Sequence, residues 1–186
     1  MNSKQQASQR TRHDLIIAAF EVMRKEGATH LTLDNVARHA GVSKGGLLHH
    51  FPNKDALIEG VLRFLLSAFE ERVTAFYAAE PDGWGRWLRA YVRASFAEEA
   101  LTPEIRAVVS MLIENQAALE IAREDTERWM ARFMQDGGSE ALIRIIQRAA
   151  DAQWLETMLM PNSINPSDML ETLLQLIDQA QPGGMK

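Results

Sequence analysis

A chain of 186 residues is long enough to bury a hydrophobic core, and it corresponds to one large domain or two small ones. It contains no cysteine, which excludes a disulfide framework, a thiolate metal site and a cysteine nucleophile. No apolar run approaches the roughly 18–20 residues of a membrane span, and the polar N-terminal residues hold no secretory signal. We therefore expect a cytoplasmic protein with no membrane partner.

The net charge of −5 is distributed unevenly along the chain. Residues 1–55 hold eight Lys and Arg against five Asp and Glu, whereas residues 56–186 hold twelve against twenty. All five histidines also precede residue 55. A basic first segment suits a polyanionic partner and an acidic body suits another role, although a difference of this size also arises by chance.

Four helices are predicted in the first part of the chain, after a polar arm that carries Arg10 and Arg12. Gly27 is placed to end the first helix, Thr32 and Ser43 are N-cap candidates for the next two, and Asn53 caps the fourth after Pro52. These helices cover Leu15 to Met23, Thr32 to Ala40, Lys44–Phe51 and Lys54–Ala79.

The helical periodicity continues to the end of the chain. The predicted ranges are Gly83–Ala100, Thr102–Asn115, Ala117–Gln135, Ser139–Met160, and a last helix capped by Ser167 that ends near Gln179. No segment shows the alternating pattern of a β-strand. We expect an all-α fold of about nine helices.

Residues 32–55 have the pattern of a helix-turn-helix. Gly41 lies between the apolar residues Ala37 and Val42, and Leu47 and Phe51 continue the apolar face four residues apart. In proteins built this way the second helix lies in the major groove of DNA. This segment therefore predicts sequence-specific DNA binding.

The first 60 or so residues resemble the tetracycline-repressor-like (TetR/AcrR) family of transcriptional regulators. The matching residues are Ala18-Ala19-Phe20, Glu26-Gly27, Leu31-Thr32, Val36-Ala37, Ala40-Gly41-Val42-Ser43, Gly45, Leu47, Phe51, Lys54 and Leu57. The rest of the chain resembles the family in its length and helical plan, with a faint similarity to multidrug-sensing members. The resemblance implies a three-helix DNA-binding head at residues 1–53 and a ligand-binding and dimerisation body at residues 54–186.

The expected DNA contacts lie in and beside the second helix of this motif. Lys44 can donate to guanine, or else to a phosphate, and Gly45 allows the backbone to approach the groove, unless it serves packing between the helices. The family usually has Tyr or another aromatic residue where this chain has Leu48, which cannot donate a hydroxyl to a phosphate. His49 and His50 can donate through their ring nitrogens. The DNA-binding set is Thr32, Ser43, Lys44, Gly45, Leu48, His49, His50 and Lys54, of which the first two also serve as caps.

All four tryptophans lie beyond residue 83, among other large apolar side chains. Such residues line adaptable pockets between helices, and a carboxylate among them favours a cation. The predicted effector site comprises Trp87, Tyr91, Met111, Glu114, Trp129, Phe133, Asp151 and Trp154. The alternative is that these residues form an ordinary core. No group of residues has metal-ligand spacing, and no cofactor is expected.

Two apolar stripes near the C-terminus suit a dimer interface made of two helices from each copy. The stripes comprise Leu142, Ile145, Ile146 and Ala149 in one helix, and Leu170, Leu173, Leu174 and Ile177 in the other. The alternative is that both stripes face the core of their own chain.

Together these features predict a ligand-responsive repressor. It would bind a palindromic double-stranded DNA operator as a homodimer, and a small apolar effector, cationic in one version of the hypothesis, would release it. One alternative is a regulator that binds DNA without an effector, and another is an all-helical enzyme. A non-enzyme is favoured because the chain lacks a Gly-rich phosphate loop, a cysteine nucleophile and a His-rich metal motif.

Overall fold

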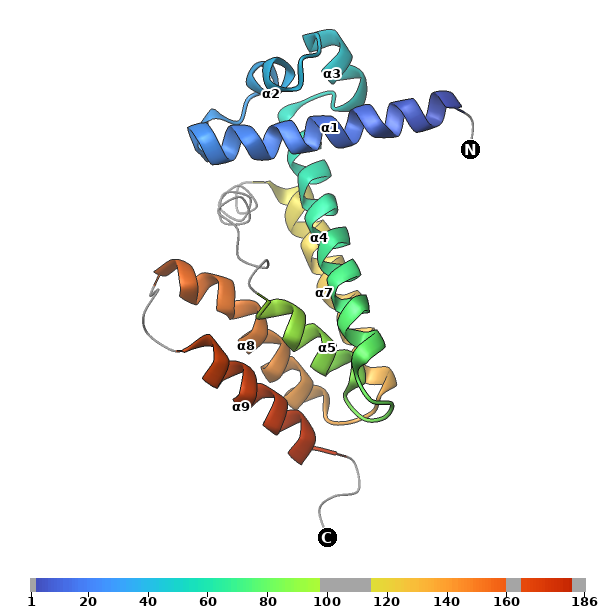
Figure 1. The fold of residues 1–186 in the computed structure, drawn as a ribbon, viewed down its shortest axis with the longest axis vertical. Coiled ribbons are helices and arrows are strands. Elements are labelled where there is room, and N and C mark those ends of the chain that lie inside the picture. The colour runs from blue at the N-terminus through green and yellow to red at the C-terminus, as the bar shows by residue number, and fades with distance from the viewer. Residues whose placement is uncertain (1–2, 98–114, 160–164, 182–186) are drawn as a thin grey trace. The chain divides into compact units, whose positions relative to one another are not determined.

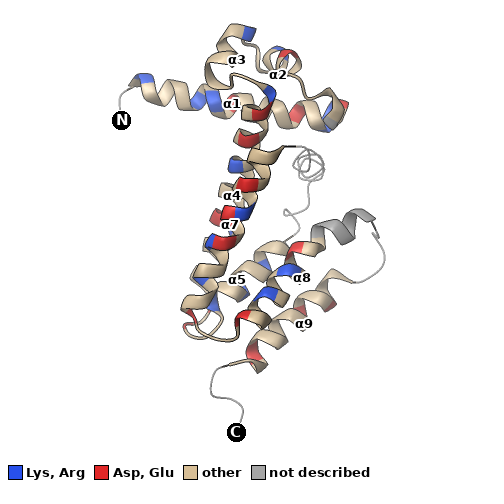
Figure 2. Ribbon diagram, turned by 180° about the vertical axis from the view of Figure 1, so that it is seen from behind, with Lys and Arg blue, Asp and Glu red and all other residues tan. Residues whose placement is uncertain are grey.

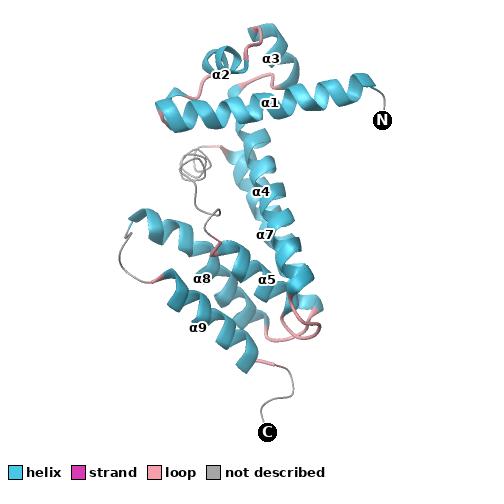
Figure 3. Cartoon of the chain, in the orientation of Figure 1, coloured by secondary structure: helices cyan, strands magenta, loops and turns pink. Residues whose placement is uncertain are grey.

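The computed structural model describes residues 3–97, 115–159 and 165–181, with the backbone alone for 28 and 154–159. Over these ranges the chain forms eight α-helices and one short 3-10 helix, without a β-strand (Figures 1 and 3). The prediction of an all-helical fold is confirmed for this part of the chain. None of its helices is both long and apolar enough to cross a membrane.

The described residues form two compact units. The first, the head, contains the chain up to Leu65 together with α7 (Gln116–Gln135) as far as Ala122. The second contains the chain from Leu66, the rest of α7, and the two C-terminal helices. The helix α4 (Lys54–Ala79) contributes residues to both units.

The head begins with α1 (Ser3–Glu26), η1 (Ala28–His30), α2 (Leu33–Ala40) and α3 (Lys44–His50). Gly27 has a φ of +90°, a conformation that glycine adopts readily, and its N–H donates to the Met23 carbonyl at the end of α1. The predicted end of this helix is therefore confirmed. The predicted polar arm was wrong: Arg10 and Arg12 lie within α1, since no Gly or Pro interrupts the helix after Ser3.

Side-chain caps set the beginnings of the next three helices, as predicted. Thr32 Oγ1 accepts from the Asn35 N–H at 3.2 Å, Ser43 Oγ accepts from the Gly46 N–H at 3.1 Å, and Asn53 Oδ1 accepts from the Ala56 N–H at 2.8 Å.

Phe51, just after α3, is buried and fixes α3 against α4. A Cβ atom at Gly60 would lie 2.5 Å from the Phe51 ring, so only glycine allows this close approach. On α1, the guanidinium of Arg12 lies over the same ring, 4.8 Å from its centroid. The two apolar anchors of α3, Leu47 and Phe51, thus face inward and leave its other side exposed.

The second unit contains α5 (Arg86–Ser95), α8 (Glu140–Leu159) and α9 (Pro166–Gln179), and α5 packs against the other two. The helix α5 begins three residues later than predicted, because Gly83 and Gly85 both have positive φ. The last helix is capped by Asn165, whose Oδ1 accepts from the Ser167 N–H, and not by Ser167 as predicted. Most of the predicted helix Thr102–Asn115 lies outside the described residues.

Candidate functional site

The helix α3 presents a continuous exposed surface made of Ser43, Lys44, Gly45 and Leu48. Lys44 Nζ makes an exposed ion pair with Asp34 on α2, 3.0 Å away. An exposed pair of this kind contributes little stability, so Lys44 can exchange Asp34 for another anionic partner at small cost. Leu48, 37% exposed, offers an apolar contact and no donor.

The two glycines of α3 have different surroundings. A Cβ at Gly45 would meet no atom within 4 Å, whereas a Cβ at Gly46 would lie 3.3 Å from Ser43 Oγ. Packing within the described protein therefore gives no reason for a glycine at Gly45. The open side of this residue suits the close approach of another molecule.

Basic groups gather where α3 ends. The rings of His49 and His50 lie edge to face with centroids 5.3 Å apart. Partial burial lowers the pKa of His50, and the charges of His49 and Arg12 lower it further. An anion placed here would offset the repulsion among the positive charges of His49, His50 and Arg12. Figure 2 shows further basic residues along the first half of α1, which has no acidic residue before Asp14.

Lys54 and Thr32 complete the predicted DNA-binding set. Lys54 is exposed and is the first residue of α4. Thr32 is exposed at the start of α2, where its hydroxyl already serves as the cap. Both lie at helix N-termini, where phosphate groups are favoured.

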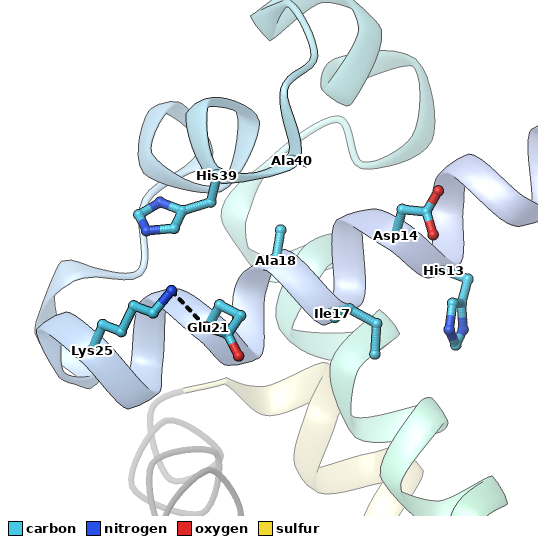
Figure 4. Close-up of a pocket in the computed structure, with 8 residues that line it drawn as sticks. All are labelled: His13, Asp14, Ile17, Ala18, Glu21, Lys25, His39 and Ala40. Carbon is cyan, nitrogen blue, oxygen red and sulfur yellow. Dashed lines mark ion pairs between the residues drawn. The ribbon is translucent and has the colours of Figure 1, made fainter.

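The head also has a surface pocket of about 340 Å³ between α1 and α2 (Figure 4). Glu21 and Lys25 form an ion pair of 2.8 Å on its wall, and hydrogen bonds from Arg24 and Lys25 lower the pKa of Glu21 to about 2. Ile17 adds an exposed apolar side chain. None of the residues predicted to bind effector lines this pocket among those described. Its charged, open wall does not suit an apolar effector.

The second unit brings together four residues of the predicted effector site. The ring of Trp129 lies 5.2 Å from that of Tyr91, 6.0 Å from that of Phe133 and 6.3 Å from that of Trp87. Phe69 joins them from α4 with its ring 5.0 Å from that of Tyr91, a contact that the sequence prediction missed. We call these five residues the aromatic cluster.

Asp151 lies at the edge of this cluster, as predicted. Its Oδ1 accepts a hydrogen bond of 2.5 Å from the Tyr91 hydroxyl. Burial raises the pKa of Asp151 to about 6, although the Tyr91 hydrogen bond opposes the shift. Burial, followed by the charge of Asp151, raises the pKa of Tyr91 well above its usual value. The carboxylate is therefore held in a site that penalises its charge.

Two further buried donors, the Trp129 indole Nε1 and the Gln147 amide nitrogen, lie in this region. The Trp129 side chain hydrogen-bonds to Asp125, and the Gln147 side chain hydrogen-bonds to Tyr91. Asp125 is also half-buried here, and burial raises its pKa while the nearby charge of Arg128 opposes the shift.

Three members of the predicted site cannot be placed in this way. Met111 and Glu114 lie outside the described residues, and so does the side chain of Trp154. The sequence prediction also missed Glu70 and Arg132, which form an ion pair beside the aromatic cluster. The sequence signal that could have identified them is their spacing: Glu70 directly follows Phe69, and Arg132 lies three residues after Trp129.

The predicted dimer stripes face in two directions. Ile146, Leu173 and Ile177 are buried in the core of the second unit, and Leu142, Ala149, Leu170 and Leu174 are partly buried against it. Ile145 is 61% exposed, and Leu176, which was not predicted, is 37% exposed. Among the described residues of α8 and α9, these last two are the large apolar side chains that are exposed.

Comparisons with known proteins agree with this arrangement. A family model of bacterial regulatory proteins, tetR family, matches residues 15–61, and a model of the tetracyclin repressor-like C-terminal domain matches residues 85–181. Over 180 residues the chain is 27% identical to the HTH-type transcriptional regulator BetI of Pseudomonas aeruginosa, covering 90% of this chain and 91% of the relative.

Solved structures show the same fold. A transcriptional regulator from Pseudomonas aeruginosa PAO1 superposes with a TM-score of 0.76 at 19% identity, covering 98% of this chain and 93% of the other. The multidrug binding protein EbrR complexed with ethidium gives a TM-score of 0.70 at 22% identity, covering 90% and 98%. Because the two family models match the helix-turn-helix and, separately, more than half of the chain, this protein belongs to the tetR family of bacterial DNA-binding transcriptional regulators.

Proposed function

We propose that this regulator is a ligand-responsive repressor that binds a palindromic operator as a homodimer and leaves it when a small aromatic cation binds the second unit. The observation that carries the effector part is the aromatic cluster with the buried carboxylate of Asp151 at its edge. A cation bound among these rings would compensate the buried charge, whereas an effector-independent regulator gains nothing from it.

In the head, the exposed surface of α3 supports a role in base contacts. Lys44 would exchange Asp34 for a base edge or a phosphate, and Gly45 would let the backbone of α3 approach the groove. Thr32, Lys54 and the histidines would contact phosphates on either side, while Leu48 would supply an apolar contact, such as one to a thymine methyl group.

A homodimer would place two copies of α3 in successive major grooves, about 34–36 Å apart. The exposed apolar side chains Ile145 and Leu176 support an interface through α8 and α9, because such side chains at helix surfaces favour association with a second copy. The buried members of the two stripes would position these helices from within.

In the second unit, a cation would gain from the faces of the aromatic rings and from the charge of Asp151. The structural neighbour EbrR is described as a multidrug binding protein and was solved with ethidium, itself an aromatic cation. The similarity to EbrR supports this ligand class for the present chain.

The helix α4 offers a route for the response, because it supplies residues to both units. An effector that binds one arrangement of α4 more tightly than another would shift the population between them. The two copies of α3 would then lose the spacing that the operator requires.

The test uses a DNA duplex selected from random sequence by the purified protein. We expect a palindromic site, binding by a dimer, and affinity that falls steeply with salt concentration. Tetraphenylphosphonium should release the protein from this duplex, while the neutral analogue triphenylphosphine oxide should do so at much higher concentration. Salt-insensitive binding would refute the DNA-binding arrangement, and equal action of the two compounds would refute the cationic effector.

A further inference from the structure

The aromatic cluster already contains a cation, which the chain itself supplies. The guanidinium carbon of Arg132, on α7, lies 4.7 Å from the ring centroid of Trp129 and 5.2 Å from that of Trp87. A guanidinium is planar and weakly hydrated, so it stacks well on indole rings. Its side chain is 26% exposed, which leaves the position accessible from solvent.

Glu70 on α4 is the counter-ion of this cation. One of its carboxylate oxygens, Oε1, pairs with Arg132, and the other, Oε2, lies 3.1 Å from Arg128 Nη2. Glu70 follows Phe69, whose ring is 6.1 Å from that of Trp129. The carboxylate and the two indoles therefore form a site for a planar cation, occupied by Arg132.

We propose that Arg132 is a built-in competitor of the effector: an aromatic organic cation enters by displacing the Arg132 guanidinium from Trp87 and Trp129 and takes over Glu70 Oε1. This inference rests on the proposed function, because it concerns the same effector site. Beyond the proposed function, it names Arg132 as the group that the effector must displace and Glu70 as the carboxylate that then pairs with the effector.

Displacement of Arg132 would also change how α4 is held against α7. The Glu70–Arg132 pair joins α4 to α7 within the second unit. An entering cation takes Glu70 Oε1 and leaves Arg132 to solvent, so one of the two described ion pairs that join α4 to α7 is lost, while Arg128 keeps the other. A neutral aromatic molecule gains nothing from Glu70 and does not replace a cation there. The site would thus respond to charge as well as to shape.

Ethidium binding, measured by calorimetry in the absence of DNA, tests the proposal. Removing the competitor in Arg132→Leu or Arg132→Gln should tighten binding by about 3- to 30-fold, the range that corresponds to a cation–π contact. Arg132→Lys keeps a positive charge and should stay near the wild-type affinity. Arg86→Leu is the matched control, because the Arg86 guanidinium stacks on the ring of Tyr77, 4.0 Å from its centroid, whereas the guanidinium over Trp87 and Trp129 is that of Arg132.

The outcomes separate this inference from the proposed function. Tighter binding by both uncharged variants, with Arg86→Leu unchanged, supports the competitor. Equal or weaker binding by both variants, when the wild type does bind ethidium, overturns the competitor and leaves the cationic effector standing. Equal tightening by Arg86→Leu would also overturn it, since loss of any positive charge would then suffice. Absence of binding to every form overturns the cationic effector and this inference together.

Discussion

Replacing Asp151 by Asn should stabilise the protein, and the gain should grow with pH. In the folded state the pKa of Asp151 is raised from 3.8 to about 6, chiefly by burial. The folded protein therefore keeps a proton that the unfolded chain loses near pH 4. Through this group the stability falls as pH rises from about 4 to about 6, and is constant above that.

The pKa difference is about two units, and each unit corresponds to about 1.36 kcal/mol, so the ionised carboxylate costs up to about 3 kcal/mol. Asn removes that charge while its oxygen still accepts from the Tyr91 hydroxyl. The variant should match the wild type near pH 4 and exceed it by up to about 3 kcal/mol above pH 7. For a protein of this size the difference corresponds to about 6–12 °C in Tm.

The assay is thermal unfolding of both proteins at equal concentration between pH 4.5 and 8, with ethidium binding at pH 7.5 as a second measurement. Glu124→Gln, an exposed change on α7, serves as the control and should alter Tm little at any pH. A difference in Tm that is the same at pH 4.5 and 8, or a variant less stable at pH 8, would refute the reasoning. Ethidium affinity should fall at least about tenfold, because the buried negative charge is lost.

Three further predictions concern the head and the dimer. Gly45→Ala should leave the free energy of unfolding unchanged or raise it by up to about 1 kcal/mol, since a Cβ there meets no atom. The same variant should bind DNA more weakly in anisotropy measurements, and an unaltered affinity would argue against close approach of α3. Lys44→Ala should cost about 1–3 kcal/mol of DNA-binding free energy and relax the preference for particular bases. Lys54→Ala should weaken binding to all sequences and reduce the slope of log affinity against log salt concentration by about 1. The same base preference in both variants would contradict the assignment of Lys44 to bases and Lys54 to phosphates. Ile145→Glu should yield a folded monomer in sedimentation experiments, because this side chain is 61% exposed, and a dimer that persists would place the interface elsewhere.

Local signals account for the helix boundaries that were predicted well. Thr32, Ser43 and Asn53 cap helices through bonds that span only three residues, so the sequence alone identifies them. The beginning of α1 was missed because its first residues are polar and lack an apolar stripe. Arg12 fixes that segment through Phe51, and such a contact cannot be inferred from periodicity.

Tertiary pairing explains what the sequence could not predict in the second unit. Ile145 and Ile146 are both apolar and point about 100° apart on α8, so composition does not tell which one faces its own core. The structure buries Ile146 and exposes Ile145. Glu70 and Arg132 are 62 residues apart, and their pairing follows only from the packing of α4 against α7.

The distribution of tryptophan also has an optical consequence. All four indoles belong to the second unit, and the head has none. Intrinsic tryptophan emission therefore comes from the second unit alone, and the stacking of Trp87 on Tyr77, with centroids 3.9 Å apart, makes part of it sensitive to small rearrangements. A dye attached to a cysteine introduced in the head, in a chain that has no other thiol, would report separately on the DNA side. One sample would then give two independent signals, one from each unit, and a delay between them would measure how long a change in the second unit takes to reach the head.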